Sequence, residues 1–264
     1  MKYLSLSNRT LIILKLVILS IFSVFIDDTF AELTAKANHD YIKIDSFYHG
    51  STVSVKGFSN PGEADLIIKL TSAEGHESLR EKGKVGSILW MNTGELKIEN
   101  VPNVYFLHST RKIEDILSRE DMDKYVLGYP ALEQHVKMNV FNDAEKTRWF
   151  NEFIKFKESS KLFNTSTGKI SLKEKDGKQN YYILTQWPYQ ALPGNYTVTV
   201  YAVKDKKVIE TATANVLVEQ VGLVKSLAEM AKNNGALYGL LSIILALGSG
   251  LGVGLVFRKS GGAH

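Results

Sequence analysis

The sequence from residue 192 to residue 203 is Leu192-Pro-Gly-Asn-Tyr-Thr-Val-Thr-Val-Tyr-Ala-Val203. Its Pro-Gly pair favours a turn, and the residues after that pair alternate between apolar and polar. Such alternation is typical of a strand that buries one face. Asp205-Lys-Lys207 then predicts a tight connection to an antiparallel partner strand at residues 208–218. We therefore expect a long β-hairpin near the end of a β-rich region.

Shorter segments with the same character precede this hairpin. Val53 and Val55 alternate with polar residues, and a Gly- and Pro-containing turn follows them. The remaining strand-like segments are residues 64–70, 87–91, 95–98, 104–107, 169–172 and 181–185. Short strands at this spacing, closed by a late hairpin, are typical of an immunoglobulin-like β-sandwich. This analogy concerns the fold and carries no function, and it leaves open whether one or two β domains are present.

A charged segment interrupts the strand pattern. Residues 112–127 suit one or two short helices, and Asn142-Asp143 can cap a helix from Ala144 to about Phe163. The aromatic face of that helix is expected to pack on a sheet, with a partner-binding face as the alternative. The fold class is therefore mainly β with α. Residues 32–110 and 165–219 form the sandwich, and residues 111–164 form a helical insertion.

The C-terminal end contains a long uncharged segment. Residues 237–257 carry no charge, and 21 residues of helix cover about 31 Å, the thickness of a bilayer core. Arg258 and Lys259 follow at once, so residues 258–264 are expected to form a cytoplasmic tail. Residues 220–236 carry an apolar stripe at helical spacing and predict a juxtamembrane helix. We therefore expect one C-terminal transmembrane helix.

Small residues recur inside this segment. Ser242, Ala246, Gly250 and Gly254 lie four positions apart and form one face of a helix, while Gly248 and Gly252 are expected to add a pair on a neighbouring face. Small residues let a second membrane helix approach closely. This pattern predicts packing against a second copy or a multi-span protein. The alternative is that glycine is simply common in membrane helices.

The N-terminal end has the features of a signal peptide. Lys2, Arg9 and Lys15 precede a short apolar run at residues 16–26, and Thr29-Phe-Ala31 ends it with small residues at the −3 and −1 positions. We expect residues 1–31 to be removed, with an uncleaved anchor as the alternative. This places the main domain in a bacterial periplasm and the anchor in the inner membrane.

The composition limits the kinds of partner and binding site that the protein can have. A net charge of +4 spread over 264 residues predicts no nucleic-acid partner, and the absence of cysteine excludes disulfides and thiolate metal sites. No motif is strong enough to name a cofactor or a catalytic group, so we expect no cofactor, and the sequence favours a non-enzymatic role over an enzyme without deciding between them. Trp90, Asn92 and Arg111 are candidates for binding an anion or a carboxylate, although such an arginine is often structural. A metal site at His39 and His49 is a further alternative.

Several motifs together resemble a known family. They are Gly86-Ser-Ile-Leu-Trp-Met-Asn92, Val101-Pro-Asn-Val-Tyr105, Ser109-Thr-Arg111, Leu192-Pro-Gly-Asn-Tyr196, the segment around Gly222, and Leu237-Tyr-Gly239 through Phe257-Arg258. The sequence is similar to an uncharacterised family of bacterial transmembrane proteins first described in alphaproteobacteria. The resemblance implies a signal peptide, a β-rich domain and one C-terminal span. Its members are often encoded beside permeases of the sulfite-exporter type, which implies an accessory role.

Three functions follow from these observations. The first is a membrane-anchored periplasmic accessory or adaptor protein associated with such a permease or with a second copy through the C-terminal helix. The second is a periplasmic module that binds an anion or a metal. The third is an envelope enzyme of unknown reaction, which the sequence neither supports nor excludes.

Overall fold

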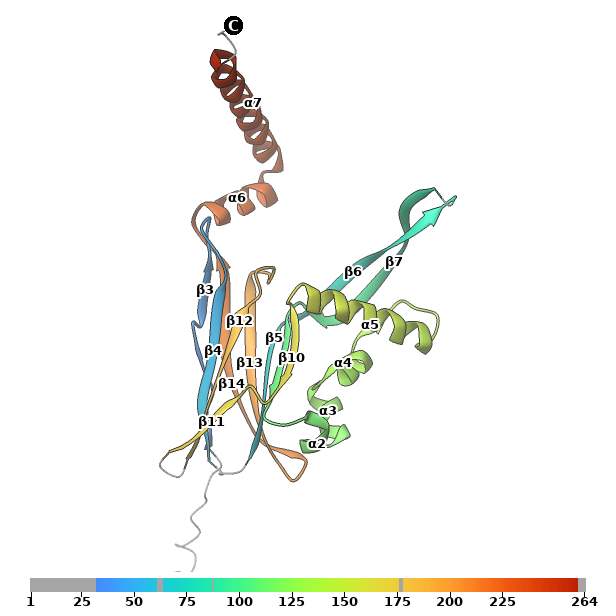
Figure 1. The fold of residues 1–264 in the computed structure, drawn as a ribbon, viewed down its shortest axis with the longest axis vertical. Helices are drawn as coiled ribbons and strands as arrows, with labels where there is room; N and C mark the ends of the chain where they lie inside the picture. Colours follow the sequence, from blue (N-terminus) through green and yellow to red (C-terminus); the bar gives the residue numbers. More distant parts are fainter. Residues whose placement is uncertain (1–31, 61–63, 87, 176–177, 261–264) are drawn as a thin grey trace, which may run out of the picture.

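The computed structural model describes residues 32–60, 64–86, 88–175 and 178–260, so the predicted signal peptide lies outside the described residues. The chain is rich in β-structure and has several sheets, including a curled half-barrel, together with some helices. One apolar helix, α7 (Gly235–Ser260), stands at the C-terminal end, beyond the sheets (Figure 1).

The first sheet has the order β1-β4-β12-β11, and β2 also pairs with β4. Its strands are antiparallel where they pair, and β4 is aligned with β12 over nine residue pairs from Ser51↔Trp187 to Ser59↔Gln179. The bounds are β1 Glu32–Leu33, β2 Lys36–Asn38, β4 Ser51–Asn60, β11 Ser171–Lys175 and β12 Lys178–Trp187.

The second sheet has the order β10-β8-β5-β13-β14-β3. Its outer pairs, β10 with β8 and β14 with β3, are parallel, whereas the inner pairs are antiparallel. The bounds are β3 Tyr41–Ile44, β5 Asp65–Ser72, β8 Tyr105–Ser109, β10 Phe163–Thr167, β13 Gly194–Lys204 and β14 Lys207–Gln220.

The hairpin predicted at residues 192–218 is confirmed as β13 and β14. Tyr196, Val198 and Val200 are buried and alternate with more exposed residues, as the sequence pattern predicts. Asp205 and Lys206 both have positive φ, at 50° and 61°. Two central residues with positive φ make the type of two-residue turn whose twist matches that of the flanking strands. The connection is therefore as tight as the sequence predicts.

The core lies between the two larger sheets. Val53 and Val55 of the first sheet and Val198 and Val200 of the second belong to one cluster of buried side chains. Trp187, at the end of β12, meets the ring of Tyr196 edge-on with centroids 4.7 Å apart. The members of this cluster all lie between Leu33 and Val218, so within the described residues the core is complete before the C-terminal helices begin.

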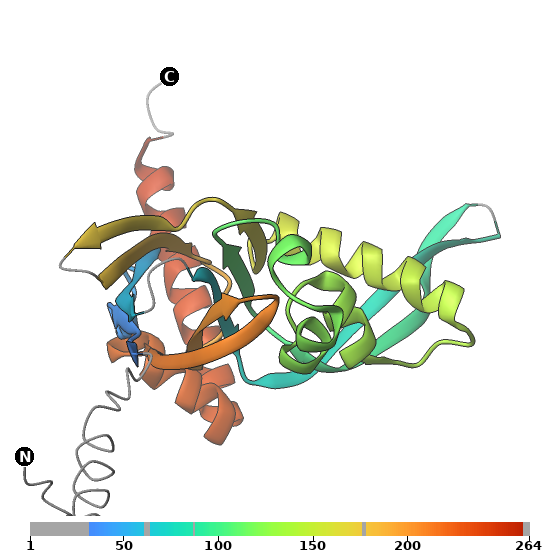
Figure 2. The same cartoon turned by 90° about the horizontal axis from the view of Figure 1, so that it is seen from below.

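A third sheet projects from the other two. It consists of the long hairpin β6 (Glu74–Val85) and β7 (Leu89–Pro102), with the short strand β9 (Lys137–Met138) beside β7. The hairpin leaves the second sheet after β5, returns to it at β8, and points away from it (Figures 1 and 2). Residues 89–91 and 95–98 of the predicted strands thus fall in one strand, β7, and belong to this third sheet, not to either of the two larger sheets.

Four helices fill the predicted insertion: α2 (Ile113–Ile116), α3 (Arg119–Tyr125), α4 (Tyr129–His135) and α5 (Asp143–Ser159). The Asn142 side chain accepts a hydrogen bond from the backbone N–H of Glu145 at 2.8 Å, which confirms it as the cap of α5. Phe153 of α5 is buried against Phe163 of β10. Helix α5 ends before Phe163, because Lys161 adopts a left-handed conformation and the chain then enters β10.

Two helices follow the last strand. Helix α6 spans Gly222–Asn233 and α7 spans Gly235–Ser260. Within the described residues, α7 is the one helix long and apolar enough to cross a membrane, with a mean hydropathy of 2.0 over Gly235–Leu255. Helix α6 is tied to the second sheet because Lys225 pairs with Glu219 at 2.8 Å and Glu219 also accepts a bond from Tyr41.

Candidate functional site

The small residues of α7 face open space. A Cβ atom added at any of the four glycines from Gly248 to Gly254 would meet nothing within 4 Å among the described residues. The hydroxyl of Ser242 donates to the carbonyl of Tyr238 at 2.8 Å, so this polar group is satisfied within its own helix. The face formed by Ser242, Ala246, Gly250 and Gly254 is therefore flat and sterically accessible.

The placement of the second glycine pair needs correction. An α-helix turns by about 100° per residue, so Gly248 and Gly252 lie about 200° from Gly250. They are on the opposite side of α7, and the expectation of a neighbouring face was wrong. The two glycine pairs consequently lie on two separate surfaces of the helix.

Arg111 is engaged by an acidic partner. Its Nε donates to Oδ1 of Asp65 at 2.9 Å, and its Nη2 donates to Oδ2 of the same carboxylate. Asp65 also accepts a bond from Thr110, and the guanidinium holds the pKa of Asp65 below its usual range. This two-pronged pair ties the end of β8 to the start of β5.

Trp90 and Asn92 lie far from this pair along the strands. The β6–β7 hairpin leaves β5 beyond Ser72, at the opposite end from Asp65, and Trp90 pairs with Lys84 near the hairpin's free end. The structure therefore does not bring Arg111 together with Trp90 and Asn92. The ammonium of Lys84 lies 5.2 Å from the centre of the Trp90 ring instead.

A buried lysine braces the base of the hairpin. Lys157 of α5 is only 1% exposed, and its Nζ pairs with the carboxylate of Glu77 on β6. The same ammonium lies over the rings of Phe153 and Phe163 at 5.5 and 5.6 Å. A buried charge with one acidic partner is expensive to unpair, so this contact holds α5 and the hairpin together. It has a sequence signal, because Phe150, Phe153, Ile154 and Lys157 share one helical face.

A cavity of about 880 Å³ opens at the side of the two larger sheets. Its wall is formed by parts of β4, β8, β10 and β12 and includes His49, Lys161, Lys169, Gln186 and Trp187. The indole N–H of Trp187 is buried and has no hydrogen-bond acceptor among the described residues. Two lysines on the wall suit an anionic or polar small molecule, although Glu158 also lies there.

His108 lies at the base of this cavity and bridges the sheets. Its Nδ1 is 2.6 Å from the hydroxyl of Ser166 on β10, and its Nε2 is 3.2 Å from the hydroxyl of Thr185 on β12. Burial lowers the pKa of His108 to about 4, and the charge of Lys169 contributes. The ring is therefore neutral at pH 7, with one nitrogen donating and the other accepting.

The two histidines considered as metal ligands have different surroundings. His39 contacts the carbonyl of Thr52 at 3.0 Å, whereas His49 lies on the cavity wall. In the described part of the chain, no three histidine or carboxylate side chains are arranged to hold a metal ion.

Sequence reasoning missed the cavity and His108. The groups around this histidine come from residues 58 and 77 positions further along the chain. They meet only because β10 pairs with β8 and the first sheet packs over the second. No local pattern in the sequence carries that information.

Comparison with known proteins identifies the family of this chain. No curated protein matches the chain. The sequence matches the family described as putative transmembrane protein (Alph_Pro_TM) over residues 32–259, which includes the β-rich region, the helices and α7. The family is uncharacterised and has no assigned activity. The chain thus belongs to the Alph_Pro_TM family of transmembrane proteins.

Proposed function

We propose that this protein is a single-span accessory or adaptor subunit of the bacterial inner membrane. Its β-rich domain lies in the periplasm, α7 crosses the bilayer, and the tail that begins at Arg258 lies in the cytoplasm. In this arrangement the domain is presented next to a neighbouring membrane protein that contacts α7. The basic residues directly after the span support the orientation.

We also propose that the two larger sheets form an immunoglobulin-like sandwich. Their orders agree with the A-B-E-D and G-F-C-C′ strand orders of that fold, with the hairpin β6–β7 inserted between the C and C′ strands. Tyr196, near the start of β13, donates its hydroxyl to the carbonyl of Leu192, as in the tyrosine corner of such domains. Domains of this architecture are common recognition modules, which is an analogy of fold only.

The observation that carries the proposal is the isolation of α7 within its own chain. None of its 21-residue candidate span is buried, and the core of the β-rich region is complete without it. A helix that only anchored a domain has no need of Ser242, Ala246, Gly250 and Gly254 in register, because glycine lowers helix propensity by about 1 kcal/mol. A flat face of this kind fits a second helix in lipid.

Two partners suit this face. One is a multi-span permease, for which the family resemblance suggests the sulfite-exporter type, and the other is a second copy of this chain. In both cases the Ser242 face is buried in the complex, whereas the opposite face with Gly248 and Gly252 is left to lipid.

The test is co-purification of the full-length protein from its native membranes in mild detergent. We compare a double variant that carries Gly250→Leu and Gly254→Leu with a matched control that carries Gly248→Leu and Gly252→Leu. The control makes the same chemical change on the other side of the helix. The expected result is a partner or dimer that survives the control changes and is lost with the Gly250 and Gly254 changes. A lone monomer in the unaltered protein, or an equal effect of both pairs, contradicts the proposal.

The cavity at His108 favours a second candidate, a periplasmic module that binds a small anion. Lys161 and Lys169 line a space of about 880 Å³ and offer two cationic donors. Calorimetric titration of the detergent-solubilised protein with sulfate, phosphate and small carboxylates tests it. Saturable heat that disappears with Lys169→Gln supports the module, and flat titrations eliminate it for those anions.

A further inference from the structure

The free end of the β6–β7 hairpin carries an apolar tip. We define the tip as Val85, Gly86 and residues 88–91, none of which is charged. Ile88 is 84% exposed and Trp90 is 67% exposed, and Val85, Leu89 and Met91 are also at least half exposed. Contiguous exposed apolar side chains of this kind mark contact sites for a membrane or another protein.

The strand register sorts the tip into two faces. Val85 pairs with Leu89 and Gly83 pairs with Met91, so the aliphatic side chains share one face. On the other face Lys84 pairs with Trp90 and Lys82 pairs with Asn92. The nearest acidic residues, Glu81 and Glu95, are further from the turn than either lysine. The tip is thus an apolar end flanked by an indole and two cations.

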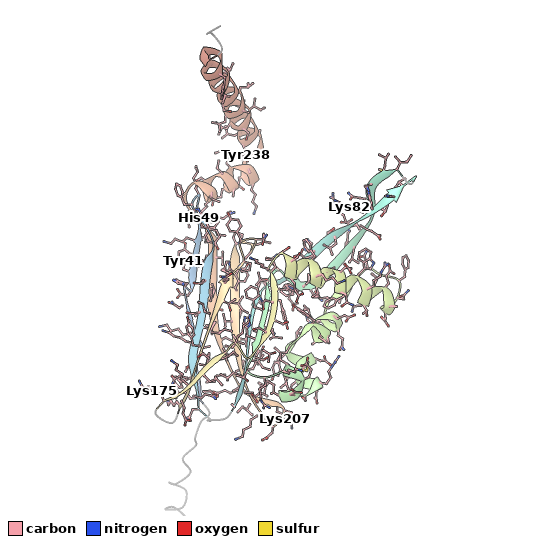
Figure 3. The ribbon with its side chains drawn as sticks, viewed as in Figure 1. Tyr41, His49, Lys82, Lys175, Lys207 and Tyr238 are labelled. Atoms are coloured by element: carbon pink, nitrogen blue, oxygen red, sulfur yellow. The ribbon has the colours of Figure 1, made fainter. Side chains whose placement is uncertain are left out.

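The tip lies at the same end of the molecule as the candidate span. In Figure 1 the hairpin rises beside the sheets toward the level of α6 and the start of α7. Figure 3 shows Lys82 on the upper part of the hairpin and Tyr238 at the start of α7, whereas Lys175 and Lys207 lie at the opposite end. The surface of a bilayer crossed by α7 is therefore on the side to which the tip points.

Helix α6 gives a second marker of that surface. Its Leu223 and Leu227 are exposed on one side, and Lys225 and Lys232 project from the rest of the helix. An amphipathic helix of this kind, directly before a span, lies in the interface between headgroups and acyl chains. Lys225 of α6 also pairs with Glu219 at the end of β14, so the helix has an ionic contact with the second sheet.

The hairpin is supported along its base. Glu77 on β6 pairs with Lys157 of α5, and Glu74 contacts His135 of α4 at 2.7 Å. On the other strand, the backbone N–H of Lys97 donates to Asn139 at 2.6 Å. These contacts come from three neighbouring segments and give the hairpin a defined direction. The tip therefore projects from a base that is held by packing and hydrogen bonds.

We propose that the tip inserts into the interfacial layer of the same bilayer that α7 crosses. Ile88 and Leu89, nearest the turn, would reach the outer ends of the acyl chains, and Trp90 would sit at the headgroup level, where indole rings are enriched. Lys82 and Lys84 would lie among the lipid phosphates, which attract basic side chains near an anionic surface. The domain then has two attachments to the membrane, at α7 and at the tip.

This proposal depends on α7 as a span and does not depend on the partner proposed above. A lipid surface is favoured as the occupant because the hairpin end combines exposed apolar side chains, an indole and two lysines, and because its own chain supplies a membrane on that side. A protein surface facing the tip is the competing outcome, and the experiment separates the two.

The absence of cysteine makes the test direct. Full-length Ile88→Cys protein is labelled with an environment-sensitive fluorophore and reconstituted into vesicles of phosphatidylethanolamine and phosphatidylglycerol. Lys175→Cys and Lys207→Cys, at the opposite end of the molecule, are labelled as controls and correct for the orientation of the protein in the vesicles. Quenching by aqueous iodide and by a nitroxide attached near the lipid headgroup is then measured.

For the Ile88 label we expect quenching by the lipid nitroxide and, because an interfacial position excludes water, iodide quenching about fivefold weaker than at Lys175. Trp90→Ser with Leu89→Ser, both exposed positions, should restore iodide quenching at residue 88 without changing the unfolding transition. Equal iodide quenching at residues 88 and 175 overturns the proposal. Shielding that appears only when native membrane proteins are added also overturns it, in favour of a protein surface.

Discussion

Acidification should destabilise the β-rich region through His108. The side chain is 5% exposed, and burial lowers its pKa from an ordinary 6.5 to about 4. Between these values the unfolded chain binds a proton at this position and the folded chain does not. Stability therefore falls as the pH is lowered from about 6.5 to about 4, and it is insensitive to His108 above pH 7.

The size of the effect follows from the same two values. At about 1.4 kcal/mol for each pKa unit, His108 should remove about 3 kcal/mol of unfolding free energy by pH 4. Folded domains have only about 5–15 kcal/mol in total. For a region of about 200 residues the loss corresponds to a lowering of Tm by about 6–12 °C.

The assay is urea unfolding of the 32–234 fragment at pH 7, 5.5 and 4, with His108→Gln as the comparison. The fragment retains every member of the core. Glutamine offers a donor and an acceptor to Ser166 and Thr185 but does not titrate. Carboxylates such as Asp65, whose folded pKa is lowered by Arg111, make both proteins less stable as the pH falls. Their contribution to the free energy of unfolding is the same in both proteins and cancels in the difference. If His108→Gln loses as much stability between pH 7 and pH 4 as the unaltered fragment, the reasoning is refuted.

Two further predictions concern stability in the same urea assay at pH 7. Lys157→Met leaves the carboxylate of Glu77 without its cation and should lower the free energy of unfolding by about 3 kcal/mol. The double variant Lys157→Met and Glu77→Leu should recover most of that loss. A double variant as unstable as the single one contradicts this account of the contact. Gly57→Ala places a methyl group 1.9 Å from the carbonyl oxygen of Thr34, so it should cost more than about 2 kcal/mol, whereas Gly75→Ala, with open space around it, should cost about 1 kcal/mol or less.

Particular elements show how far the sequence pattern reaches into this fold. Residues 192–218 could be assigned as a hairpin because alternation and turn residues are properties of neighbours in the chain. Asn142 could be assigned as a cap for the same reason. Residues 89–91 and 95–98 were predicted as β-structure within the same sandwich as the other strands, but they belong to a separate third sheet, because alternation does not specify which partner a strand joins.

The candidate sites divide in the same way. The small face of α7 is visible in the sequence because it needs only the period of one helix. His108, in contrast, meets Ser166 and Thr185 across two strand pairings, and the sequence around residue 108 does not indicate burial of the ring. Arg111 and Trp90 are only 21 positions apart in the sequence. Arg111 follows the end of β8, whereas Trp90 lies near the free end of the β6–β7 hairpin, which extends from the opposite end of the β5–β8 pair.

The sequence alone determined that this protein has a β-rich region and a C-terminal helix of bilayer length. Both follow from local periodicity and from an uncharged run whose length must match the thickness of the hydrocarbon core. Only the tertiary structure decided that the hairpin β6–β7 leaves the sheets and points to the end where α7 begins. That direction is set by contacts such as Lys157 with Glu77, 80 residues apart, whose energy depends on burial and charge pairing between distant segments.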